Sequence, residues 1–148
     1  MQKITTFLWF DNQAEEAAEF YTSVFKDSKI NRVTHSQGKV LTVVFQLFGQ
    51  EFIALNGGPL FKFTEAISLF VDCETQREVD YYWAKLSDGG HEQCGWLKDR
   101  YGLSWQIIPR RLMELLRDKD PERAKRVMQA MLQMKKIDIA GLEQAASS

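Results

Sequence analysis

Apolar and polar residues alternate along the chain with two periodicities, one typical of strands and one typical of helices. Residues Ile4–Phe10 have the composition of a strand. In the segment that follows, small and apolar side chains recur at helical spacing, which predicts a helix that lies on a sheet. Asn12 followed by Glu15 has the spacing of a capping box, so the helix is predicted to begin there. Three β-rich runs come next and predict a meander of strands at 29–36, 39–48 and 52–56.

The same pattern starts again in the second half of the chain. Ile67–Asp72 has the composition of a strand and Thr75–Leu86 that of a helix, and Asp72 stands where Asp11 stands in the first copy. The second meander is shorter, with strands clear only at 91–96 and 104–108. A repeat of this kind predicts two supersecondary units that share one core, because neither unit can bury its sheet alone.

The end of the second copy predicts a hairpin. A short strand, Gly95–Lys98, leads into the turn Asp99–Gly102, and a second strand, Leu103–Ile108, leaves it. Because side chains alternate along a strand, the face that includes Trp105 is wholly apolar and is predicted to carry helices. The opposite face includes Gln106 and is mixed in character. We expect the cavity of the protein on this mixed face.

The C-terminal segment follows neither copy. Arg110–Arg117 has a helical pattern, and Asp120 before Pro121 is typical of a helix N-terminus. Apolar side chains then form a stripe that needs a surface to cover. The stripe consists of Val127, Met131, Met134 and Ile137. Methionines also suit an adaptable binding groove, but at helical spacing they more often pack in a core or a dimer, and we expect a subunit contact.

The composition is that of a globular protein with little net charge. The chain has 148 residues, 45% of them hydrophobic, and 19 basic against 20 acidic side chains give a net charge of -1. This balance gives no electrostatic reason to bind nucleic acid or an anionic membrane. The sequence shows no apolar signal core and no run long enough to span a bilayer, so we expect a cytoplasmic protein. Cys73 and Cys94 lack metal-binding spacing and are expected to be reduced thiols.

Several short motifs, in the same order along the chain, resemble one known family. They are Leu8–Asp11, Glu15–Ala17 with Phe20–Tyr21, Ala54–Pro59, Cys94–Asp99 and Ser104–Gln106. Together they resemble the PhnB-like family of the vicinal oxygen chelate (glyoxalase/bleomycin-resistance) superfamily, a family also labelled 3-demethylubiquinone 3-methyltransferase-like. The resemblance implies an α+β fold of two tandem βαβββ modules, each curled around a cavity, usually in a homodimer. On this basis we expect a single domain with modules at 1–60 and 61–109 and C-terminal helices at 110–148.

The resemblance also implies where a metal would be held. Metal-dependent members of the superfamily use His and Glu from the first and last strand of each module. Where these relatives have Glu on the last strand, this chain has Gln106, and an amide brings no charge. The matching first strands present Thr5, Phe7 and Trp9, and Ala66, Ser68 and Phe70. His35 and His91 are expected on the surface, so we predict no catalytic metal and no other cofactor.

The methyltransferase label meets a similar difficulty. An enzyme that uses S-adenosylmethionine generally needs a glycine-rich turn that leads from a strand into a helix. The candidate turn here is Asn56–Pro59, which runs into Phe61–Phe63 and then another strand rather than a helix. Methyl transfer is therefore not the preferred interpretation, but it stays an alternative that the family label suggests, as does a dioxygenase-like reaction of the superfamily.

What remains is a cavity walled by aromatic rings with a few amides, a thiol and a hydroxyl. These groups suit a small, partly apolar ligand held by stacking and neutral hydrogen bonds. The predicted ligand-binding residues are Phe7, Trp9, Phe45, Asn56, Phe70, Cys94, Trp96, Ser104 and Gln106. The alternative is that these rings only fill the interior of the sheets.

Four functions stay open at this point. The first is a binding module without catalysis. The second is an enzyme without a metal that uses Cys94 or an aspartate as its reactive group; the candidate aspartates are Asp11, Asp72 and Asp99. The third is a metal-dependent lyase or isomerase completed across a dimer by His35 or His91. The fourth is a structural protein that binds a partner through its methionine-rich tail.

Overall fold

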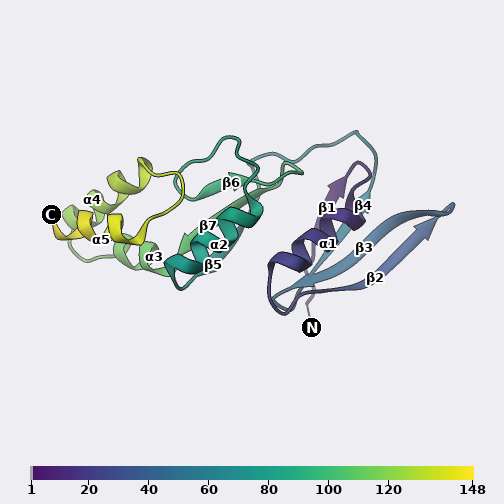
Figure 1. Cartoon of the computed structure of the whole chain (residues 1–148), viewed down its shortest axis with the longest axis horizontal. Coiled ribbons are helices and arrows are strands. Elements are labelled where there is room, and N and C mark those ends of the chain that lie inside the picture. The colour runs from purple at the N-terminus through teal and green to yellow at the C-terminus, as the bar shows by residue number, and fades with distance from the viewer. Residues whose placement is uncertain (1) are drawn as a thin grey trace. The chain divides into compact units, whose positions relative to one another are not determined.

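The computed structural model describes residues 2–148, which form strands and helices in two compact units (Figure 1). The units are Met1–Phe63 and Thr64–Ser148. Each has a sheet with a helix packed on it, which confirms the α+β fold of two tandem modules with a C-terminal helical extension. No helix among residues 2–148 combines the length and the apolar character needed to cross a membrane. The shared core of the two halves stays a prediction, because the structure defines each unit by itself.

The first unit is a four-stranded sheet with one helix. Its strands run in the order β1-β4-β3-β2, with β1 parallel to β4 and the other neighbours antiparallel. The elements are β1 (Thr6–Phe10), α1 (Ala14–Val24), β2 (Lys29–Ser36), β3 (Lys39–Leu47) and β4 (Gln50–Asn56). The predicted meander is confirmed. Its two turns contain Gly38 and Gly49, both at a φ of 78°, a conformation that glycine adopts without steric cost.

The start of α1 differs from the capping box predicted at Asn12. The N-cap is Gln13, which makes no side-chain cap bond. Instead, the side-chain oxygen of Asn56, at the end of β4, accepts a hydrogen bond of 2.8 Å from the Ala14 amide. The first helical N–H groups need acceptors that the helix itself cannot supply. Here a residue far along the sequence supplies one, which local spacing could not reveal.

Phe45 lies on the helix-covered face of the first sheet, and its predicted place in a cavity wall is wrong. The side chain is fully buried, stacks on Phe52 with ring centroids 5.5 Å apart, and meets the Tyr21 ring of α1 at 6.1 Å. Phe45 pairs with Phe52 in the antiparallel register. The two rings therefore belong to the α1 side, whereas Phe7, 55% exposed, lies on the open side.

The second unit begins with a smaller sheet of three strands in the order β5-β7-β6. Strand β5 is parallel to β7, and β6 is antiparallel to β7. The elements are β5 (Ser68–Cys73), α2 (Gln76–Leu86), β6 (Trp96–Lys98) and β7 (Ser104–Pro109). A shorter second meander was expected and is confirmed. The strand predicted at 91–96 is wrong, because this segment is irregular apart from an isolated bridge between Gln93 and Trp96.

The hairpin turn between β6 and β7 is held by a buried carboxylate. Oδ1 of Asp99 accepts hydrogen bonds from the Tyr101 and Leu103 amides, at 2.8 and 3.1 Å, and Oδ2 accepts one of 2.9 Å from the Trp105 indole. Asp99 is 2% exposed. A buried carboxylate is tolerated only when such donors replace its lost water. The predicted turn is confirmed, and its aspartate is structural.

Three helices complete the second unit and gather at the C-terminal end of the chain (Figure 1). They are α3 (Arg110–Leu116), α4 (Pro121–Leu132) and α5 (Ile139–Ser147). The predicted cap is confirmed, since the Asp120 side chain accepts a hydrogen bond of 3.0 Å from the Glu122 amide. Helix α5 was not predicted.

The apolar stripe of the tail packs inside the unit rather than against another subunit. Val127 and Ile137 are fully buried in a cluster with Ile108 of β7 and residues of α3 and α5, and Met131 and Met134 pack against it. The expected subunit contact through this stripe is therefore wrong. The surface that the stripe covers is formed by β7, α3 and α5, and sequence periodicity did not indicate α5.

Candidate ligand-binding site

The second sheet has one helix-covered face and one open face, as the hairpin pattern predicts. Trp105 and Ile107 are buried on the side of α2. The strand registers pair Ser104 with Ser68 and with Lys98, and pair Gln106 with Phe70 and with Trp96. Paired residues point to the same side of a sheet. The open face therefore consists of Ser68, Phe70, Trp96, Lys98, Ser104 and Gln106.

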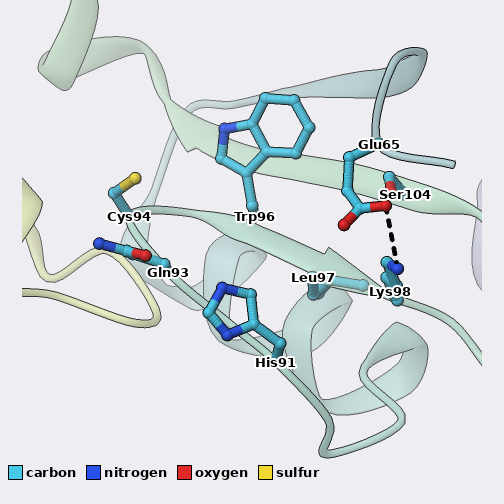
Figure 2. Close-up of a pocket in the computed structure, with 8 residues that line it drawn as sticks. All are labelled: Glu65, His91, Gln93, Cys94, Trp96, Leu97, Lys98 and Ser104. Atoms are coloured by element: carbon cyan, nitrogen blue, oxygen red, sulfur yellow. Dashed lines mark ion pairs between the residues drawn. The ribbon is translucent and has the colours of Figure 1, made fainter.

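This face opens into a hollow of about 240 Å³ beside β6 (Figure 2). It is lined by Glu65, His91, Gln93, Cys94, Trp96, Leu97, Lys98 and Ser104. Of these, Cys94, Trp96 and Ser104 were predicted from the sequence. Lys98 was missed, although its strand position two residues after Trp96 already placed it on the same face. Glu65 and His91 come from irregular segments. No local pattern indicates Glu65, and His91 was expected only as a surface residue or as a metal ligand completed across a dimer.

The Ser104 hydroxyl is the most unusual group in the hollow. Ser104 is 1% exposed, and within the described residues its Oγ has no hydrogen-bond partner. A buried polar group without a partner costs about 1–3 kcal/mol. Such a group therefore marks either a local defect or the place of a missing partner.

A single ion pair lies at the rim of the hollow. Nζ of Lys98 is 3.1 Å from Oε1 of Glu65, and the two side chains are 39% and 63% exposed. The hydrogen bond from Lys98 is the main cause that lowers the pKa of Glu65 below its ordinary value. Because both groups remain in contact with water, the pair contributes little to stability. It can open at small cost.

The position that would carry a metal-binding Glu holds a neutral network instead. Nε2 of Gln106 donates a hydrogen bond of 2.9 Å to Oγ of Ser68. Neither side chain brings the charge or the imidazole that a divalent centre needs. Within residues 2–148, no three His, Cys, Asp or Glu side chains gather in a group that could hold a metal ion. The side chains of this face thus do not fit the metal site of the superfamily.

Three of the four reactive groups considered from the sequence, Cys94, Asp99 and Asp72, are poorly suited to catalysis. Burial raises the pKa of the Cys94 thiol, and only the thiolate is a good nucleophile. Asp99 is committed to its turn, and Asp72 forms an ion pair of 2.9 Å with Arg110 on the surface. Asp11 lies at the edge of a different hollow, in the first unit.

The remaining predicted residues lie in the first unit. Phe7 and Trp9 are on the open face of its sheet, where Nε1 of Trp9 donates a hydrogen bond of 2.9 Å to the Gly58 carbonyl. Their role in ligand binding stays a prediction. Asn56 pairs with Phe10 on the opposite side, and both ends of its amide are engaged, by the Ala14 amide and the Val40 carbonyl. Asn56 thus lies on the side of α1 and not beside Trp9, but it lines the hollow of the first unit together with Asp11, and its role in ligand binding stays a prediction.

Comparison with known proteins places these observations in a family. A family model described as 3-demethylubiquinone-9 3-methyltransferase matches residues 2–108. The PhnB protein from Bacillus cereus has a similar solved structure, with 38% identity and a TM-score of 0.66 over 73% of this chain and 99% of that one. Comparison with curated proteins gives no match.

More distant structures share the fold. Protein PA1353 from Pseudomonas aeruginosa is 15% identical, with a TM-score of 0.61 over 74% of this chain and 98% of that one. A glyoxylase/bleomycin resistance protein/dioxygenase domain from Frankia sp. EAN1pec is 13% identical, with a TM-score of 0.50 over 74% of this chain and 92% of that one. The family model ends at residue 108, so α3, α4 and α5 lie beyond it.

Proposed function

The chain belongs to the 3-demethylubiquinone-9 3-methyltransferase (PhnB-like) family, within the vicinal oxygen chelate superfamily, and from this premise we propose that it binds a small, partly apolar molecule in the hollow of its second unit. The observation that supports this most strongly is the Ser104 hydroxyl, which belongs to a lining residue of the hollow, is buried, and has no hydrogen-bond partner among residues 2–148. A bound molecule would supply the missing hydrogen bond.

The walls of the hollow support a ligand with a planar ring. The Trp96 indole and the Leu97 side chain provide apolar contact, and aromatic rings commonly pack by stacking or edge contacts. A hollow of about 240 Å³ lies just below the range of about 300–1,000 Å³ typical of ligand pockets, so it suits only a small compound of one or two rings. The ligand contacts that we propose are those of Trp96, Ser104 and Cys94, with Phe70 and Gln106 adjacent on the same face.

Binding is favoured over the methyl transfer that the family name describes. The glycines of the candidate turn are engaged inside the first unit, since the Gly57 and Gly58 amides donate to the Phe10 and Asp11 carbonyls at 2.8 and 3.1 Å. The chain then continues as an irregular segment rather than a helix. These amides do not form the helix N-terminus that usually receives an anionic cofactor. The proposal therefore includes no methyl-transfer step.

We also propose that the protein acts in the cytoplasm as a homodimer. Phe7 and Phe70, on the open faces of the two sheets, are 55% and 50% exposed, and such apolar side chains favour burial on association. Sedimentation analysis tests this, and a protein that remains monomeric at all concentrations would contradict it.

Nuclear magnetic resonance of the tryptophan indole groups tests the binding proposal directly. The four tryptophans give four indole signals, which single Trp→Phe variants assign. We expect benzamide and benzoate, two planar probes of the same shape, to shift the Trp96 signal. The Trp83 signal, from α2, serves as an internal control. A Trp96 signal that neither probe moves, up to the solubility of each, would overturn the proposal.

A further inference from the structure

Lys98 and Ser104 form a pair of donors on neighbouring strands. They are opposite each other in the antiparallel register of β6 and β7, on the same face, and both line the hollow. Lys98 offers an ammonium group, and Ser104 offers a hydroxyl without a partner among residues 2–148. Residues opposite each other in such a ladder have Cβ atoms about 5 Å apart. A carboxylate, with its two oxygens, is the kind of group that can accept from both.

In this structure Lys98 already forms an ion pair with a carboxylate of the same chain, that of Glu65. Oε1 of Glu65 lies 3.1 Å from Nζ of Lys98. The dashed line in Figure 2 marks this ion pair. Glu65 lies in the irregular segment before β5 and not on the sheet. Its side chain is 63% exposed, so an exchange with water or with another anion costs little.

We propose that the hollow selects a small carboxylate attached to a planar ring, that Lys98 and Ser104 hold the carboxylate, and that Glu65 is the internal group it displaces. This inference rests on the proposed function and gives the chemical class of its ligand. The ring lies against Trp96, and the carboxylate is at the end of the hollow nearest Lys98. In the free protein Glu65 neutralises Lys98, and in the complex the ligand takes over that role.

The Lys98 ammonium accounts for the selectivity, and the Glu65 carboxylate reduces it by competing for the same ammonium. A neutral ligand leaves the Glu65–Lys98 pair intact and gains only the Ser104 hydrogen bond. An anionic ligand gains a hydrogen bond from a charged donor, which is roughly twice as strong as a neutral one. Competition with Glu65 offsets part of this gain, so removing the Glu65 charge should strengthen anion binding and leave neutral binding unchanged.

Benzoate and benzamide provide the matched pair for the test, because they differ chiefly in charge. Dissociation constants come from the Trp96 indole signal at low salt. We expect benzoate to bind roughly tenfold more tightly than benzamide, the ratio that one charge-assisted hydrogen bond at a partly exposed site provides. Lys98→Met should abolish this preference. Lys119→Met, which removes the same charge from an exposed position in the loop between α3 and α4, should leave it intact.

Glu65→Gln supplies the decisive variant. It should tighten benzoate binding by roughly two- to fivefold, the equivalent of a weak exposed ion pair, and leave benzamide binding unchanged. The Lys98 and Glu65 side chains are 39% and 63% exposed, so Lys98→Met and Glu65→Gln are expected to fold. Circular dichroism of each variant checks the fold.

The outcomes separate the two proposals. If benzamide and benzoate bind equally well and Lys98→Met affects neither, the hollow binds planar molecules without selecting a carboxylate. The present inference is then wrong and the proposed function stands. If neither probe shifts the Trp96 signal in any of the variants, both are wrong.

Discussion

The two sheets share an arrangement of strands, but the polar groups on their open faces differ in hydrogen bonding. In each unit the first strand lies parallel to the last, β1 beside β4 and β5 beside β7. On the open face of the first sheet, the Trp9 indole N–H is bonded to the Gly58 carbonyl. On that of the second sheet, the Ser104 hydroxyl is buried with no partner in the described part of the chain.

The difference follows from the chain that leaves the last strand of each unit. After β4, the chain turns back over its own sheet, where Gly57 contacts the Trp9 indole and the Phe61 ring meets it edge-on at 4.9 Å. After β7, the chain enters α3 at once and packs its helices around Ile108. The first open face is therefore partly covered from within, and the second keeps its hollow. The two units thus share an arrangement of strands, and the different segments that follow their last strands leave different open faces.

Loss of the Asp99 carboxylate should have the largest effect, because it should lower the stability of the second unit much more than that of the first. Asp99→Ala leaves three N–H donors of a buried turn without their acceptor, and we expect the second unit to lose about 3 kcal/mol or more of stability. Urea denaturation followed through the indole signals of Trp105 and Trp9 separates the two units. The Trp105 transition should move to lower urea and that of Trp9 should move less.

Asp88→Ala is the matched control for Asp99→Ala. Asp88 is exposed in the same unit, and its amide, not its carboxylate, bonds to the Lys98 carbonyl. We expect a change within about 0.5 kcal/mol. Equal effects of the two substitutions would show that the buried turn does not hold the second unit together.

A single methyl group at Gly57, in the segment that follows β4, should disturb the contact between this segment and the Trp9 indole. A Cβ at Gly57 would lie 2.5 Å from Cε2 and Cζ2 of Trp9, so Gly57→Ala must push the indole away from the Gly58 carbonyl. Overpacking of this kind costs about 1–3 kcal/mol. We expect the first unit to lose stability by that amount and the Trp9 indole signal to shift.

Gly90→Ala provides the comparison for Gly57→Ala, since a Cβ there meets nothing within 4 Å. We expect no loss of stability, because the added methyl group contacts nothing in the native state. Its main effect is to reduce the conformational freedom of the unfolded chain. If Gly57→Ala were as harmless as Gly90→Ala, Trp9 would be free to move, and the first open face would be no more covered than the second.

The sequence was sufficient for the parts of this comparison that depend on local periodicity. Alternation along Leu103–Ile108 correctly assigned Trp105 to the helix side and Gln106 to the open side. The same alternation should have excluded Phe45 from the cavity, because Phe45 pairs with Phe52 on the side of α1. The type of an aromatic side chain therefore does not place it in a cavity unless the face of its strand is known as well.

Other features depend on contacts between distant segments, which no local pattern contains. Asn56 caps α1 from the end of β4, and Glu65 reaches Lys98 from an irregular segment. The packing of Val127 and Ile137 required α5, whose alanine-rich sequence has a weak apolar stripe. Tertiary placement decides such cases, so the capping box at Asn12 and the subunit contact of the tail were reasonable on propensity and still wrong.

The smallest expected effect concerns two serines that face each other across β5 and β7. Ser68 accepts a hydrogen bond from Gln106, so Ser68→Ala should cost about 1 kcal/mol, as loss of an ordinary hydrogen bond does. Ser104 makes no such bond, and Ser104→Ala removes a buried hydroxyl that is unsatisfied in the free protein. We expect this variant to be as stable as the parent or more stable by about 0.5–1 kcal/mol.

Urea denaturation of the two serine variants, alone and with benzoate, measures both sides of the argument. Benzoate should stabilise the parent and Ser68→Ala but stabilise Ser104→Ala much less, because a ligand raises stability only through its affinity for the native state. A protein that gains stability and loses binding through the same substitution carries a group retained for its ligand. Destabilisation by Ser104→Ala as large as that by Ser68→Ala would mean that the hydroxyl is already bonded within the fold, and the second open face would then resemble the first.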